Sequence, residues 1–198
     1  MVKLDFMNIA VLPVTAPEFL AWERKEERKH EYFEGEVIDF AGASLAHNHI
    51  VANLLKEVGN RLEDKPCQIL PSDMRVTTPN ETVYMYPDAV IVCGQPEMAD
   101  SKFDTLKNPR VIFEVLSPST SYHDRVRKFA FYKLIPSFRE YVLIDSQQLY
   151  AEVGRRQEDG SWDFESTVDP HGYLRVPSVK AFIPLRAIYR NVFPEPVL

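Results

Sequence analysis

The sequence contains only two cysteines, Cys67 and Cys93, and their separation matches no metal-binding pattern. A cysteine-based metal site is therefore excluded, and nothing in the cysteine content calls for an oxidising compartment. Both residues lie beside apolar neighbours, so we expect two small buried side chains.

Long hydrophobic runs are also missing. No segment approaches the roughly 20 apolar residues that are needed to span a bilayer. The short apolar stretch at residues 9–14 follows Asp5 and Asn8 and is broken by Pro13, so it is too short and poorly flanked for a signal peptide. We therefore expect a cytoplasmic protein that makes no membrane contact.

An excess of positive charge is missing as well, because Asp and Glu (29) outnumber Lys and Arg (23) and the formal net charge is -6. This balance excludes a protein coated in positive charge, although it leaves room for a local basic groove. The chain has no phosphate-cradling glycine loop, no zinc-finger spacing and no serine-nucleophile elbow. Low-complexity sequence is absent, and 198 residues with 45% hydrophobic content are enough for a single domain, residues 1–198, around one core.

Local patterns in the first half predict a helix and a hairpin before the central elements. Residues 1–14 are expected to form a tail or an edge strand. Thr15 and Pro17 are typical of a helix start, and the charged helix should reach about His30 with a solvated face, anchored by Leu20 and Trp22. Residues 32–40 predict a hairpin that turns at Glu34-Gly35. A second helix should run from its cap at Ser44 to about Leu62.

The second half predicts strands around one more helix. Strands are expected near residues 67–70, 74–77, 84–93, 111–116 and 141–144, with a polar connection over 94–109. Ser121 and Asp124 have a capping-box-like spacing for a helix to about Leu134. Residues 149–175 predict a hairpin around Asp159-Gly160, and the apolar stretch 181–189 should pack on the core or form a dimer contact. The order predicts an α+β (mixed α/β) fold, with a central mixed β-sheet flanked by helices and with peripheral hairpins.

Two predicted strands each carry a carboxylate. Asp88 follows Pro87 at the start of the apolar run 89–93, and Glu114 interrupts the run 111–116. A buried, unpaired carboxylate costs several kcal/mol, so such a group usually has a partner. Oxygen-only ligands favour hard cations, which suggests Mg2+ or Mn2+. The alternatives are an exposed strand edge for Asp88 and a solvent-facing position on a one-sided strand for Glu114.

These carboxylates belong to an ordered set of motifs that resembles the PD-(D/E)XK nuclease superfamily. The set is most similar to the Uma-type restriction endonuclease family of that superfamily, and the resemblance covers roughly residues 16–188. The matching segments are Tyr32-Phe33-Glu34-Gly35-Glu36, Ala43-Ser44-Leu45-Ala46-His47, Tyr86-Pro87-Asp88-Ala89-Val90, Phe113-Glu114-Val115-Leu116-Ser117-Pro118-Ser119-Thr120, Asp124-Arg125-Val126-Arg127-Lys128-Phe129 and Glu140-Tyr141. The resemblance implies a restriction-endonuclease-like core.

The resemblance also implies a catalytic set of Asp88, Glu114 and Lys128. The metal, Mg2+ or Mn2+, would be held by Asp88, Glu114 and the main-chain carbonyl of Val115. The superfamily pattern expects a lysine two residues after the second acid, where this chain has Leu116. Lys128 matches the position of the Uma-type lysine on the following helix instead.

Helical spacing and further matches suggest additional site residues. Asp124, Lys128 and Tyr132 are spaced by four, so they should share a helix face. Glu36 is a candidate third acidic ligand, and the alternative is a solvated turn. His47 would line the site by resemblance, and the alternative is an exposed histidine at a helix start. A charged helix face is the alternative for Lys128.

The first functional hypothesis is a magnesium-dependent endodeoxyribonuclease that acts on DNA as a homodimer. The alternative is a non-catalytic nucleic-acid-binding or structural protein on the same fold, which Leu116 in the usual lysine position motivates. A third class is a carboxylate-pair glycosidase, which would need neither metal nor lysine.

Overall fold

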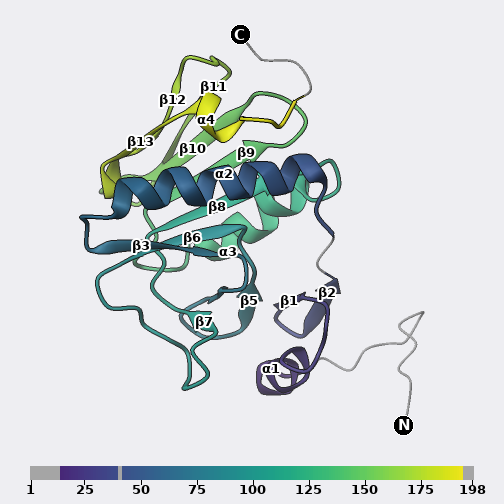
Figure 1. Cartoon of the computed structure of the whole chain (residues 1–198). Coiled ribbons are helices and arrows are strands. Elements are labelled where there is room, and N and C mark those ends of the chain that lie inside the picture. The colour runs from purple at the N-terminus through teal and green to yellow at the C-terminus, as the bar shows by residue number, and fades with distance from the viewer. Residues whose placement is uncertain (1–13, 40–41, 194–198) are drawn as a thin grey trace.

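A computed structural model of the chain describes residues 14–39 and 42–193. The predicted N-terminal tail or edge strand therefore lies almost wholly outside the described residues. Two sheets form the body of the fold, and helix α2 (Leu45–Leu62) crosses one face of the larger sheet (Figure 1). A helical segment made of η1 (His123–Lys128) and α3 (Phe129–Tyr132) lies behind the same sheet. No helix among the described residues is long and apolar enough to cross a membrane.

The larger sheet has six strands in the order β11-β10-β9-β8-β6-β3. Only β8 and β9 pair in parallel, because η1 and α3 form the crossover between them, and every other pairing is antiparallel. The predicted central mixed sheet with flanking helices is thus confirmed. Its strands are β3 (Cys67–Pro71), β6 (Ala89–Cys93), β8 (Val111–Leu116), β9 (Glu140–Asp145), β10 (Ala151–Arg156) and β11 (Trp162–Thr167).

A smaller sheet has the order β2-β1-β5-β4-β7, and a two-stranded sheet pairs β12 with β13. The smaller sheet consists of β1 (His30–Phe33), β2 (Glu36–Asp39), β4 (Arg75–Thr77), β5 (Val83–Met85) and β7 (Thr105–Leu106). The remaining elements are α1 (Ala16–Glu23), β12 (Tyr173–Val176), η2 (Pro177–Val179), β13 (Ala181–Pro184) and α4 (Leu185–Ile188). Ala181, Ile183 and Leu185 lie in the core beneath α2, so the C-terminal stretch packs on the core as predicted.

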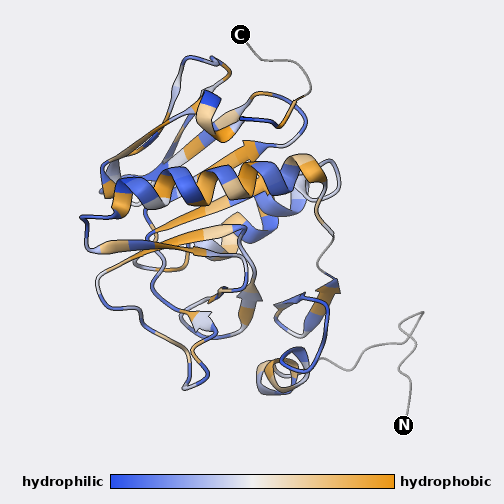
Figure 2. Ribbon diagram, in the orientation of Figure 1, coloured by the Kyte–Doolittle hydropathy of each residue, from blue (hydrophilic) through white to orange (hydrophobic). Residues whose placement is uncertain are grey.

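Strand β8 is buried on both faces. Phe113 and Val115 pack against the apolar stripe of α2, whereas Ile112 and Leu116 pack on the side of Tyr132. Figure 2 shows the strands next to α2 as largely hydrophobic, while α2 alternates between the two kinds of residue. A two-sided strand carries a continuous apolar run, so Glu114 on β8 is a charged residue with no route to bulk water along its strand.

Several predicted elements are confirmed. Ser44 caps α2 by accepting a hydrogen bond from the His47 amide. The β1–β2 hairpin turns at Glu34 and Gly35, which both have positive φ. The β10–β11 hairpin has its predicted turn at Asp159-Gly160, where Gly160 also has positive φ.

The first helix is shorter than predicted. Thr15 and Glu18 form its capping box, but α1 ends at Glu23 rather than near His30. Phe19 is its fully buried anchor, whereas Leu20 and Trp22 are only partly buried. The segment that follows has helix-like composition, yet the chain must turn there to bring His30 into β1.

The predicted strand over 84–93 is two strands in different sheets. β5 ends at Met85 and β6 begins at Ala89, and Tyr86-Pro87-Asp88 connects the two sheets. Pro87 has no amide hydrogen for a ladder, so a break at this position is the physical expectation. The polar connection over 94–109 also contains the short strand β7.

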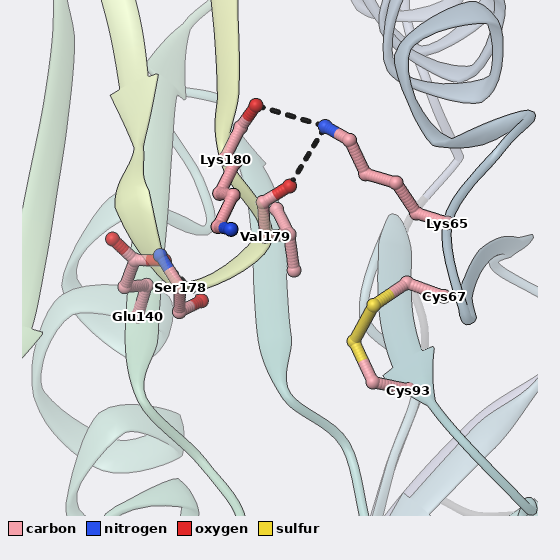
Figure 3. Close-up of a disulfide and its surroundings, with 7 residues drawn as sticks. All are labelled: Lys65, Cys67, Cys93, Glu140, Ser178, Val179 and Lys180. Carbon is pink, nitrogen blue, oxygen red and sulfur yellow. Dashed lines mark hydrogen bonds between the residues drawn. A yellow bond between two sulfur atoms is a disulfide. The ribbon is translucent and has the colours of Figure 1, made fainter.

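The two cysteines are not independent buried side chains. Cys67 on β3 and Cys93 on β6 are direct partners in the antiparallel ladder, are half-buried and form a disulfide (Figure 3). In the same view, Lys65 donates hydrogen bonds to the carbonyls of Val179 and Lys180. These contacts tie the edge strand β3 and the turn before it to the rest of the fold.

Candidate active site

The connection between the two sheets sets the position of Asp88. Its amide donates to the carbonyl of Phe113 at 3.1 Å, which aligns it with β8. Its side chain is buried, with Oδ2 accepting from the Val115 amide at 2.6 Å and Oδ1 lying 3.1 Å from Nε2 of His47. The exposed-edge interpretation of Asp88 is therefore wrong.

Glu114 lies one strand away on β8 and is 2% exposed. Its Oε1 accepts a hydrogen bond from the hydroxyl of Tyr132 at 2.9 Å and lies 2.7 Å from Nζ of Lys128. The solvent-facing interpretation of Glu114 is wrong, because both partners come from the helical segment that covers this face of the sheet.

Lys128 is also 2% exposed, so the charged-face interpretation of this lysine is wrong. Besides Glu114, its ammonium lies 3.0 Å from Oε1 of Glu31 and 3.6 Å from Oδ1 of Asp124, and it donates to the carbonyl of Tyr86 at 3.1 Å. The helix over 123–128 is π-helical rather than α-helical, but the spacing of four still brings Asp124, Lys128 and Tyr132 to one side.

Glu31 on β1 is a further member of this cluster and was not among the predicted site residues. It is buried, accepts from the Tyr86 amide at 2.9 Å and lies 3.0 Å from Nε2 of His123. The signal that could have found it is the one used for Glu114, namely a carboxylate beside the strand-forming residues Tyr32 and Phe33.

The remaining candidates divide into two groups. His47 is not an exposed helix-start residue, because it contacts Asp88 and its Nδ1 is buried without a hydrogen-bond partner among the described residues. Glu36 does not join the cluster, since its side chain is 60% exposed and pairs with Arg127. Leu116 is buried in the apolar cluster beside Ile112, so a lysine at its position would displace core packing.

These side chains line a cavity of about 490 Å³. Its other walls come from the start of α2 and from the loop between β8 and the helix. The lining residues are Glu31, Ile38, Asp39, Gly42, Ala43, Ser44, His47, Asp88, Glu114, Val115, Ser117, Pro118, Ser119, Thr120, His123, Asp124, Lys128 and Gln147.

The charges in the cavity are unbalanced, because its lining holds five carboxylates (Glu31, Asp39, Asp88, Glu114 and Asp124) and one ammonium, that of Lys128. Burial raises the pKa of Glu114 well above its usual value, since the attraction of Lys128 is outweighed by burial and by the neighbouring acids. Burial also raises the pKa of Asp124. Glu31 is the exception: burial opposes its ionisation, but Lys128 and the hydrogen bonds from His123 and Tyr86 lower its pKa.

The pKa of the Lys128 ammonium is set by burial and by the carboxylates around it, which act in opposite directions. Burial alone would favour neutral Lys128, but Glu114, Glu31 and Asp124 raise its pKa well above the usual value. Lys128 is therefore a permanent cation at neutral pH, and it can donate hydrogen bonds but cannot accept a proton.

The donor set fits a divalent cation. Asp88 and Glu114 supply carboxylates, and Val115, which follows Glu114 on β8 and donates its amide hydrogen to Asp88, also lines the cavity. Excess buried negative charge and oxygen donors are what Mg2+ or Mn2+ requires. Among residues 14–39 and 42–193, however, no group of three or more His, Cys, Asp or Glu side chains has metal-binding geometry. A main-chain oxygen such as that of Val115 would have to complete the set.

Comparison with known proteins points to one family. Residues 16–185 match the family model Uma2, which is described as "Putative restriction endonuclease". An uncharacterised protein of Synechocystis sp. is 37% identical over 148 residues, which cover 73% of this chain and 84% of that protein. A second uncharacterised Synechocystis protein is 33% identical over 154 residues, covering 77% and 80% of the two chains.

A solved structure shares the fold. The crystal structure of a protein from Anabaena variabilis, described as a "putative nuclease belonging to DUF820", has a TM-score of 0.74 to this chain. It covers 91% of this chain and 100% of its own, at 19% sequence identity, so it bears on the fold alone. The family match extends over both strand acids and the helical lysine, and the chain therefore belongs to the Uma2 family of restriction-endonuclease-like proteins.

Proposed function

We propose that this chain is a magnesium- or manganese-dependent endonuclease that hydrolyses DNA phosphodiester bonds in the cavity around Asp88, Glu114 and Lys128. The observation that carries the proposal is the 2.7 Å contact between Lys128 Nζ and Glu114, with Asp88 held against β8 from the connection before β6. A cation next to paired carboxylates can stabilise the charge that develops in phosphodiester hydrolysis. The proposed nuclease domain covers residues 16–188 of a single-domain chain, residues 1–198.

Each residue has a defined task in this proposal. A bound divalent cation would polarise the phosphate and lower the pKa of a water molecule. The Val115 amide and His47 hold the Asp88 carboxylate in one orientation. Lys128 remains protonated, so it offsets the negative charge of the transition state and donates a hydrogen bond to water or a phosphate oxygen. Tyr132 fixes Oε1 of Glu114.

The proposal is tested by the cleavage of supercoiled DNA with Mg2+. Wild type should nick or linearise the plasmid, chelator should stop the reaction, and Glu114→Gln and Lys128→Met should be inactive while remaining folded. Lys133→Met is the matched control, because Lys133 is exposed on the same helical segment. Cleavage that persists in both site variants would show that the assigned site is wrong. Activity that persists in chelator would instead favour the metal-free third class, a carboxylate-pair hydrolase.

The non-catalytic alternative also has an observation in its favour. Lys128 already neutralises part of Glu114, and three side-chain ligands do not converge among the described residues. Calorimetric titration with Mn2+ separates the two proposals. Binding that disappears in Asp88→Asn supports the metal-dependent enzyme, whereas DNA binding without any Mn2+ binding supports a nucleic-acid-binding protein.

A homodimer would place two such sites on the two strands of one duplex. In the plasmid assay, a dimer that cuts both strands in one encounter yields linear product without accumulation of nicked circles. Sedimentation of the purified chain with and without a short duplex measures the assembly directly. A monomer in both conditions would remove the homodimer from the proposal.

A further inference from the structure

Three arginines lie side by side at the other end of the larger sheet. Arg110 precedes β8, Arg139 precedes β9 and Arg156 ends β10. The Arg139 amide donates to the Arg110 carbonyl at 2.9 Å, and the Arg156 amide donates to the Arg139 carbonyl at 2.9 Å. Three neighbouring strands therefore each contribute one guanidinium at the same level, and we call this set the arginine row.

The arginine row has no acidic partner. None of the three guanidinium groups lies within ion-pair distance of a carboxylate in residues 14–39 and 42–193. Arg139 and Arg156 donate only to the main-chain carbonyls of Pro136, Phe138 and Ile135. The Nε of Arg110 is buried and lacks a hydrogen-bond partner in the same residues. Most of the donors that three guanidinium groups offer are thus unused.

Three acids lie near the row in the chain, Glu140, Glu158 and Asp159, and two of them are hydrogen-bonded elsewhere. Glu140, the neighbour of Arg139, accepts hydrogen bonds from the amide and the hydroxyl of Ser178, which lies beside it in Figure 3. Asp159 accepts from the amide and hydroxyl of Ser161 inside its turn. Neither carboxylate forms an ion pair with the row, and the charge of Glu140 interacts with that of Arg110 only over a longer distance.

Like charges on directly neighbouring strands destabilise a sheet. The effect is visible on Arg139, whose pKa is lowered by burial and by the charges of Arg110 and Arg156. An anion placed against the row would relieve this repulsion and use the free donors.

A cavity of about 630 Å³ opens beside two members of the row, Arg139 and Arg156, and its other walls are Pro136 and the turn 157–160, which includes Glu158 and Asp159. We propose that the arginine row is a binding site for a phosphate-type oxyanion, separate from the carboxylate cavity. Guanidinium groups suit this ligand because their planar pairs of N–H donors match two oxygens of one phosphate. Arg110 and Glu114 are four residues apart on β8, about 13 Å along the strand, so one small anion cannot occupy both places.

The phosphate could belong to a free ion or to a nucleic-acid backbone, and the site does not depend on the chain being a nuclease. Isothermal titration in chelator-containing buffer tests both sources, with inorganic pyrophosphate and with a short DNA duplex as probes. Wild type should bind at least one probe, and Arg139→Gln and Arg156→Gln should weaken that binding roughly tenfold or more. Arg186→Gln, a change at an exposed arginine on α4, should leave it unaltered.

Two further variants keep the result interpretable. Arg139→Lys retains the charge and the fold but loses the paired donors, so it should bind more weakly than wild type even if Arg139→Gln does not fold. Lys56→Met, a change at an exposed lysine on α2, should retain the binding. Binding of neither probe, equal binding by all arginine variants, or an equal loss in Lys56→Met would overturn the proposal. Loss of pyrophosphate binding in the row variants would assign a free oxyanion, and loss of duplex binding alone would assign the backbone.

Discussion

Replacement of Glu114 by glutamine should make the metal-free protein more stable at neutral pH. Glu114 is buried among Asp88, Glu31 and Asp124, and burial raises its pKa well above 4.5. A group whose pKa is raised in the folded state contributes stability below its unfolded pKa and loses it as the pH rises through the folded pKa. Glutamine keeps an oxygen that can accept from Tyr132 and Lys128 but carries no charge.

The magnitude follows from proton linkage. Above pH 4.5, the usual value for this side chain, wild type loses about 1.4 kcal/mol of unfolding free energy per pH unit relative to Glu114→Gln. The two proteins should be closest in stability at pH 4 and should separate steadily towards pH 7. The difference becomes constant once the pH exceeds the folded pKa of Glu114.

Urea denaturation between pH 4 and pH 7.5, with chelator present, measures the two curves. Saturating Mn2+ should then narrow the difference, because a ligand at 100 times its Kd stabilises the folded wild type by about 2.7 kcal/mol and the variant has lost a proposed ligand. Parallel pH curves, or a variant that is less stable at every pH, would refute the charge imbalance described for this cavity.

Three further results are expected. Lys128→Met leaves Glu31 and Glu114 buried without their cation and should lower the unfolding free energy by about 3–5 kcal/mol at pH 7. Part of this loss should be recovered at pH 4.5, because Glu114 is then protonated. Lys133→Met should match wild type in the same denaturation series. Reduction of the Cys67–Cys93 bridge, which closes a separation of 26 residues, should cost about 3 kcal/mol of stability, and thermal melts with and without reductant measure it. Glu31→Gln should reduce the plasmid-cleavage rate more than it changes substrate affinity, because Glu31 positions Lys128; an unchanged rate would leave it a structural residue.

Local sequence patterns were sufficient to predict the elements whose signals lie within their own residues. The stripe of α2, the two-sided apolar strand β8 and the Asp159-Gly160 turn carry their signals locally, and all three were predicted. The end of α1 was not, because the charged segment after Glu23 suits a helix as well as a loop. Only the tertiary demand that His30 enter β1 decides between them.

The site was predictable to the same extent. Asp88 and Glu114 are conspicuous because one begins and the other interrupts an apolar run. The motif identified Lys128, and the helical spacing of four grouped it with Asp124 and Tyr132. The partners of His47 and Glu31 depend on how α2 and β1 dock, which no local pattern encodes. The disulfide was missed because register between β3 and β6, not cysteine spacing, brings Cys67 to Cys93.

The Tyr86 backbone, which accepts from Lys128 and donates to Glu31, has a consequence for folding kinetics. Its contacts join positions that are distant along the chain: 42 residues separate Tyr86 from Lys128, and 55 separate Tyr86 from Glu31. Contacts of such separation form late, since long loops must close first. A chain still emerging from the ribosome, with η1 not yet made, has no cavity of this kind. The proposed chemistry can therefore begin only after synthesis has passed residue 128 and both sheets have docked.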